Sequence, residues 1–155
     1  MSAKVNPIPT GYEGATPYIC CKGAAAAIEF YKKAFGAEEI GRLDVPGGLI
    51  GHAEIKIGRA IVMMADEYPD MGFLSPKSIG GTPVQIYVYV PDVDALAQRA
   101  TAAGAKVLRP VADQFYGDRS VHLEDPFGHR WGFATRIEDL TPEEIERRAK
   151  AKFGG

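Results

Sequence analysis

The sequence is short of the residues that mark secreted and membrane proteins. Its 155 residues include only two cysteines, Cys20 and Cys21, which are neighbours in the chain. A disulfide bond between neighbours would be strained and no second pair exists, so we interpret both as reduced thiols in the core. The longest apolar run, AIVMMA at 60–65, is far too short to cross a bilayer, and residues 1–14 contain no apolar signal segment. We therefore expect a cytoplasmic protein without a membrane partner.

An excess of either charge is also missing. The chain has 18 basic and 20 acidic residues and no basic stripe with interleaved aromatic residues, so nothing predicts a nucleic-acid partner. The hydrophobic fraction of 46% and the charged fraction of 25% are typical of a globular protein rather than a disordered or fibrous one. A chain of this length forms one domain or two small half-domains with a sizeable core.

The chain follows one course twice, as a strand, a helix and three further strands. His52 and His122 are 70 residues apart, and so are Gly58 and Gly128. This constant offset predicts an α+β fold made of two βαβββ modules. The expected strands are 15–21, 38–45, 49–58 and 59–65, then 83–90, 106–111, 119–125 and 129–136; the expected helices are 24–36 and 92–104.

The repeat divides the chain into five segments. They are an amino-terminal arm at 1–14, a first module at 15–67, a linker at 68–82 that is rich in Gly, Pro and Ser, a second module at 83–137, and a final helix at 138–155. The final helix has Thr141 at its N-cap, Pro142 at its first position and Glu144 three residues after the cap. We expect it to pack against the protein or support a dimer, and membrane or partner binding is the alternative.

The strand expected at 83–90 shows how each sheet distributes its side chains, since successive residues point to opposite faces. One row is apolar and the other is more polar: Val84, Ile86, Val88 and Val90, against Gln85, Tyr87 and Tyr89. We expect a helix to cover the apolar row. The tyrosine row then faces a wet but enclosed space, which suits amphipathic rings.

Several motifs occur together and in order: HAEIKIG, VMMADEYP, YVYVPDVDA, FYGDR and DPFGHRWGFAT. With the duplicated βαβββ unit, they resemble the vicinal oxygen chelate superfamily of glyoxalases, bleomycin-resistance proteins and extradiol dioxygenases, and within it the PhnB-like branch. The resemblance covers about residues 12–137. It implies two modules whose sheets form a U-shaped cleft, a homodimer, and, in metal-using members, one divalent ion held by the first and last strand of each module.

The resemblance also says where the metal ligands would stand. The four positions fall on Thr16, Gln85, Gly132 and either Val62 or Met63. A zinc, nickel or manganese ion needs several nitrogen, sulfur or carboxylate donors, whereas this set offers one amide and one hydroxyl. We therefore expect no metal at the superfamily position and no cofactor.

The three histidines suggest other chemistry. His52 and Glu54 form a His-x-Glu pattern that recurs as His122 and Glu124, and a spacing of two on a strand puts both side chains on one face. The pairs are candidates for acid–base catalysis, each glutamate orienting and charging its histidine. The alternatives are cross-strand polar pairing on a half-wet face and a new metal site built from all four. The third histidine lies in 125–129, which we interpret as a tight structural turn.

Alternation in the last strands predicts the surroundings of these groups. Trp131 is expected to pack under a helix, while Gly132 leaves open space at the floor of the cleft. Arg119 either contacts an anionic group of a ligand or pairs with Asp118 or Asp125.

Three functions remain open. The first is a metal-free homodimer that binds a small amphipathic or aromatic molecule in its cleft, as in drug sequestration and antibiotic resistance. The second is an enzyme of the same fold that uses His52, Glu54, His122 and Glu124, and the third is a metal-dependent lyase or dioxygenase. The residues expected to line the ligand site are Thr16, Tyr18, Met63, Gln85, Tyr87, Arg119 and Gly132.

Overall fold

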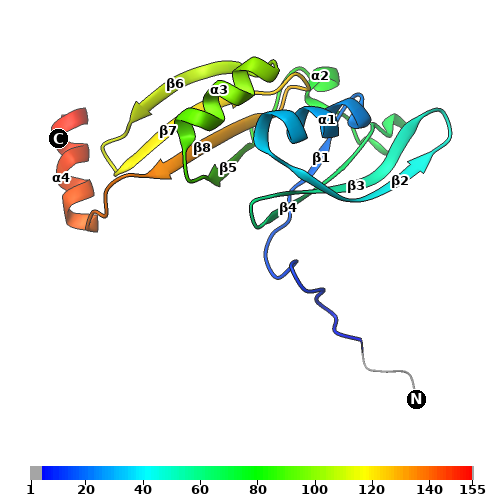
Figure 1. The fold of residues 1–155 in the computed structure, drawn as a ribbon, viewed down its shortest axis with the longest axis horizontal. Coiled ribbons are helices and arrows are strands. Elements are labelled where there is room, and N and C mark those ends of the chain that lie inside the picture. The colour runs from blue at the N-terminus through cyan, green and yellow to red at the C-terminus, as the bar shows by residue number, and fades with distance from the viewer. Residues whose placement is uncertain (1–4, 155) are drawn as a thin grey trace.

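Two βαβββ modules make up most of the protein (Figure 1). The structure is a computed structural model that describes residues 5–154, so residues 1–4 of the expected arm and residue 155 lie outside the described part. The first module contains β1 (Tyr18–Cys20), α1 (Ala24–Phe35), β2 (Glu38–Val45), β3 (Leu49–Ile57) and β4 (Ala60–Ala65). The second contains β5 (Gln85–Tyr89), α3 (Val93–Ala103), β6 (Lys106–Asp113), β7 (Asp118–Glu124) and β8 (Arg130–Arg136). The predicted α+β fold and its duplicated unit are confirmed.

The strands form two separate four-stranded sheets with the same topology. Their orders are β1-β4-β3-β2 and β5-β8-β7-β6, in which the first strand pairs in parallel with the last and the other pairs are antiparallel. Within the described residues, no strand pairing joins the two sheets, so β1 and β5 are both edge strands. The sheets lie side by side along the long axis of the molecule (Figure 1).

One hydrophobic core joins the modules, because α1 and α3 pack against each other between the sheets. The apolar stripe of α1 includes Tyr31 and Phe35, which are buried as their helical spacing predicts. From the other module, β8 contributes Trp131 and Phe133, both fully buried as expected. The ring centroids of Tyr31 and Trp131 are 5.4 Å apart, and those of Phe35 and Phe133 are 4.7 Å apart. The core is therefore common to both halves.

The turn at 125–129 ties the modules together through polar groups. The buried carboxylate of Asp125 accepts hydrogen bonds from the Tyr31 hydroxyl at 2.6 Å and from the Trp131 indole N–H at 2.9 Å. It also accepts from the backbone N–H groups of Phe127 at 2.8 Å and His129 at 3.0 Å. The His129 ring bonds through Nε2 to the carbonyl of Cys20 on β1 at 2.7 Å. This segment therefore has the structural role expected for it.

The connecting segments hold three further helices. The linker forms η1 (Pro69–Met71) and α2 (Pro76–Ile79), and the chain ends in α4 (Pro142–Phe153) at the far end of the second module (Figure 1). The Thr141 hydroxyl accepts from the Glu144 N–H at 3.2 Å, as the capping pattern predicts. Phe153 packs edge-on against Phe115 in the β6–β7 turn. Among residues 5–154, no helix is long and apolar enough to span a membrane.

Candidate small-molecule binding site

Each sheet has one face packed on the common core and one uncovered face, and most of the candidate residues lie on the uncovered faces. On β4, Val62 and Met64 are buried in the core, so Met63 points to the uncovered face. Tyr18 is the β-sheet neighbour of Met63. Thr16 precedes β1 and lines a groove of about 570 Å³ together with Met63 and Glu54.

A chain of hydrogen bonds crosses the uncovered face of the first module. The Tyr18 hydroxyl lies 2.7 Å from His52 Nδ1, and His52 Nε2 lies 3.1 Å from Glu54 Oε1. The Tyr12 hydroxyl, from the amino-terminal arm, donates to the other oxygen of Glu54. The bond from Tyr12, and then the bond with His52, lower the pKa of Glu54 against the opposing effect of burial. Because His52 is bonded at both ring nitrogens, this arrangement suits proton transfer between Tyr18 and the carboxylate.

The second module does not repeat this chain. His122 Nδ1 lies 3.1 Å from the amide oxygen of Gln85, and the expected bond between His122 and Glu124 is not formed in the described structure. The nearest basic partner of Glu124 is Arg130, at 3.9 Å. Burial, followed by the charge of Arg109, lowers the pKa of His122, so its imidazole is neutral at pH 7. The prediction that Glu124 charges its histidine is wrong.

The space above Gly132 is filled rather than open. A Cβ atom at Gly132 would lie 2.4 Å from Gln85 Nε2 and 2.5 Å from Tyr87 Cδ2. The missing side chain therefore lets Gln85 and Tyr87 lie across β8, where Gln85 reaches His122. The expectation of an open cleft floor at Gly132 is corrected, because two neighbouring side chains occupy it.

Arg119 does not reach the uncovered face. Its guanidinium bonds to Asp94 on α3 at 2.7 and 2.9 Å and to Asp113 at 2.8 Å. Successive side chains of a strand point to opposite faces, so Arg119 points to the same side of β7 as the buried Val121 and Leu123, which is the helix side of the sheet. The structure therefore pairs Arg119 with Asp94 and Asp113 rather than with the expected Asp118 or Asp125.

The residues at the superfamily metal position do not fit a divalent ion. Gln85 directs its amide oxygen to His122, and Thr16 and Met63 contribute only a hydroxyl and a thioether. A glutamate in place of Gly132 would have to displace Gln85 and Tyr87. Within residues 5–154, no group of three or more His, Cys, Asp or Glu side chains is arranged to hold a metal. The donor set at this position therefore does not fit a divalent ion.

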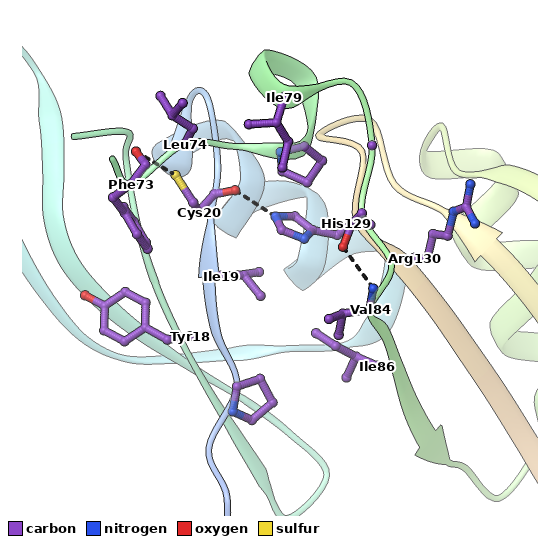
Figure 2. Close-up of a pocket in the computed structure, with 14 residues that line it drawn as sticks. Tyr18, Ile19, Cys20, Phe73, Leu74, Ile79, Val84, Ile86, His129 and Arg130 are labelled. Atoms are coloured by element: carbon purple, nitrogen blue, oxygen red, sulfur yellow. Dashed lines mark hydrogen bonds between the residues drawn. The ribbon is translucent and has the colours of Figure 1, made fainter. Parts of the chain in front are cut away.

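A second groove, of about 300 Å³, runs between the edge strands β1 and β5 (Figure 2). Its walls are mainly apolar and include Tyr18, Phe73, Leu74, Ile79, Val84 and Ile86. Its two reactive side chains are not available for catalysis. His129 is bonded to the Cys20 carbonyl, and burial raises the pKa of the Cys20 thiol to about 11. The groove therefore offers mainly apolar contact area.

Two residues of the first module's face were not predicted from the sequence. Tyr12 belongs to the arm and Phe73 to the linker, so neither has a counterpart in the repeat. Tyr12 holds Glu54, and the Phe73 ring packs edge-on against Tyr18 with centroids 5.7 Å apart. Both are aromatic residues in stretches rich in Gly and Pro, which is a weak signal for contact with the sheet.

Comparison with known proteins identifies the family. Residues 15–133 match the model of the Glyoxalase/Bleomycin resistance protein/Dioxygenase superfamily. The chain belongs to this superfamily. The uncharacterized protein Rv0887c of Mycobacterium tuberculosis is 41% identical over 143 residues, which cover 90% of this chain and 84% of that one.

Two solved structures have a similar fold. TioX from Micromonospora sp. ML1 is 28% identical with a TM-score of 0.64, and the match covers 83% of this chain and all of TioX. The PhnB protein from Bacillus cereus is 21% identical with a TM-score of 0.59, covering 79% of this chain and 99% of that one. The likeness to PhnB concerns the fold alone.

Proposed function

We propose that this superfamily member is a homodimer that binds a small amphipathic or aromatic molecule in its cleft without a metal. In one chain the two sheets lie side by side (Figure 1). The groove that Thr16 lines does not include Gln85. A second protomer would bring the uncovered face of its second module against the first module of its partner. The observation that carries this proposal is that each uncovered face presents a half-exposed tyrosine on its edge strand, Tyr18 on β1 and Tyr87 on β5.

The side chains available there suit recognition of an uncharged or weakly polar ring system. Aromatic and apolar groups, namely Tyr18, Met63 and Tyr87, would supply contact area, while Thr16 and the Gln85–His122 pair would supply a few polar anchors. Retention of an unmodified drug, as the name of the bleomycin resistance proteins suggests, needs no catalytic group. Sequestration of such a molecule is therefore the form of this function that we favour.

Binding and assembly are tested together with bleomycin as the probe. Sedimentation equilibrium should give a dimer, and isothermal titration calorimetry should give saturable binding. Tyr18→Ala and Tyr87→Ala should each weaken binding by about tenfold, the usual effect of removing a buried aromatic anchor. Phe153→Ala, an aromatic truncation on α4, is the matched control and should change nothing. A protein that is monomeric in sedimentation and still binds bleomycin would refute the dimer cleft. The absence of saturable binding would exclude bleomycin-type molecules as ligands.

A second candidate function, acid–base catalysis, is favoured by the Tyr18–His52–Glu54 chain. A glyoxalase substrate is a suitable first choice, because glyoxalases give the superfamily part of its name. If the protein turns it over, His52→Gln should abolish activity, whereas His122→Gln should retain it because His122 is held by Gln85. Equal loss in both variants would show that the chain across the first module is not the catalytic element.

A further inference from the structure

A buried carboxylate stands at the end of the second module, away from Thr16 and Gln85. Asp118, the first residue of β7, is only 5% exposed. Its side chain accepts one hydrogen bond, from the Tyr89 hydroxyl at 2.7 Å. Among the described residues, no Lys, Arg or His forms an ion pair with it. A buried charge with one neutral donor is poorly compensated.

A second polar group on the same face has no partner. Ser120 lies two residues further along β7, so its side chain points to the same side of the sheet as Asp118. It is 1% exposed, and its hydroxyl has no hydrogen-bond partner in the described part of the chain. Buried polar atoms are nearly always satisfied in native proteins, so two buried polar groups with few partners on one face of β7 are unusual.

Tyrosine side chains lie near the carboxylate of Asp118. The rings of Tyr87 and Tyr89 meet with centroids 5.6 Å apart and an interplanar angle of 66°. Burial, followed by the neighbouring Tyr116 and its hydroxyl, raises the pKa of Tyr87, so these phenols remain neutral. A hollow of about 590 Å³ opens beside them, lined by Tyr89, Tyr116, Asp118, Arg136 and Ile145.

The one cation of this hollow is already engaged. Arg136 is the last residue of β8, is largely exposed, and forms an ion pair with Asp139. It is the cross-strand neighbour of Asp118, but its guanidinium pairs with Asp139 rather than with that carboxylate. The hollow therefore combines two tyrosine side chains with a buried acidic group.

We propose that this hollow binds the ammonium group of a small organic cation, such as a quaternary or alkylated amine. The rings of Tyr89 and Tyr116 would contact the alkyl groups on nitrogen, and Asp118 would supply the opposing charge. All residues that line the hollow belong to the second module and to α4, so the site does not require the cleft proposed above, although Tyr89 shares the uncovered face of β5 with Tyr87.

The test compares choline with 3,3-dimethylbutan-1-ol, which has the same shape but carbon in place of the charged nitrogen. Calorimetry on the full chain should show saturable binding of choline and at least about tenfold weaker binding of the alcohol. Asp118→Asn, which keeps the shape and removes the charge, should weaken choline binding by about tenfold. Asp44→Asn, the same change at an exposed position of β2, should leave it unaltered.

Two further variants separate the loss of this site from misfolding and from failure of the dimer cleft. Tyr116→Leu removes one ring without touching the carboxylate and should also weaken choline binding, which decides the matter if Asp118→Asn fails to fold. Tyr18→Ala should leave choline binding unchanged, so a failure of the dimer cleft is distinguishable from a failure of this site. Absence of saturable choline binding by the unaltered protein, or equal binding of choline and the alcohol, would overturn the proposal.

Discussion

Replacement of Asp125 by asparagine tests how the two modules are held together. Asparagine keeps one oxygen to accept from the backbone N–H groups of Phe127 and His129, but it places an NH₂ group opposite the Tyr31 hydroxyl and the Trp131 indole. A tyrosine hydroxyl can turn to accept from this group. An indole N–H is a donor only, so Trp131 would face another donor in a fully buried site.

The size of the effect follows from these bonds. A hydrogen bond to a charged group contributes about 1.5–3 kcal/mol, and leaving a buried donor unsatisfied costs about 1–3 kcal/mol. Since these two terms overlap, we expect Asp125→Asn to lower the free energy of unfolding by about 3 kcal/mol. Tyr31→Phe is the matched comparison, because it removes one donor to the same carboxylate and keeps the ring; we expect about 1–2 kcal/mol there.

The measurement is urea denaturation followed by the fluorescence of Trp131, which is the only tryptophan in the chain. Far-UV circular dichroism gives a second reading that does not depend on the indole. The Asp125→Asn/Tyr31→Phe double variant should be less destabilised than the sum of the single changes, because both act on one hydrogen-bond network. A loss below about 0.5 kcal/mol in Asp125→Asn, typical of a neutral surface position, would refute the reasoning.

Three further predictions concern charges. Arg119→Ala should weaken the attachment of α3 but leave bleomycin affinity unchanged in calorimetry, because the guanidinium is held by Asp94 on the helix side; a weaker affinity would place it in the ligand site. Tyr12→Phe should raise the pKa of Glu54, measured by carboxyl NMR. The lowered pKa of Glu54 contributes stability that is present above its unfolded pKa and is lost as the pH falls through its folded pKa. Tyr12→Phe should therefore lose less stability in acid than the unaltered protein. An unchanged pKa of Glu54 in this variant would contradict the prediction. The folded pKa of His122 is lower than the ordinary histidine value of 6.5, so below that pH the unfolded chain binds the proton first and the unaltered protein loses stability. His122→Gln should remove this part of the acid destabilisation. Identical changes of the urea midpoint between pH 7 and pH 5 in the variant and the unaltered protein, a range set by that value, would count against it.

Local patterns in the sequence were sufficient to predict most of the fold. The alternation of Ile86 and Val88 with Tyr87 predicted which face of β5 meets the core, and the Thr141 cap predicted the start of α4. These features depend on neighbours within a few residues, for which side-chain periodicity and capping chemistry are reliable guides. The same parity rule applied to β7 places Arg119 beside Val121, so its position on the helix side was also readable from the sequence.

The side-chain partners on the uncovered faces were not predictable in this way. Gln85 reaches His122 only because Gly132, on the strand between them, has no Cβ. Asp118 is covered because Tyr89 lies over it, 29 residues away in the chain. These contacts depend on rotamers chosen in competition with distant neighbours, and a single sequence contains no direct signal for them. Tyr12 illustrates the extreme case, since it lies outside the repeat altogether.

The common core has a consequence for the integrity of the chain. Tyr31 and Phe35 of the first module are packed on Trp131 and Phe133 of the second, so neither half contains a complete interior of its own. Cleavage within the linker, for example at the exposed Met71, would therefore leave two fragments that hold each other in place. Each fragment expressed alone would expose the aromatic surface that its other half normally covers, and the two would regain structure only on mixing.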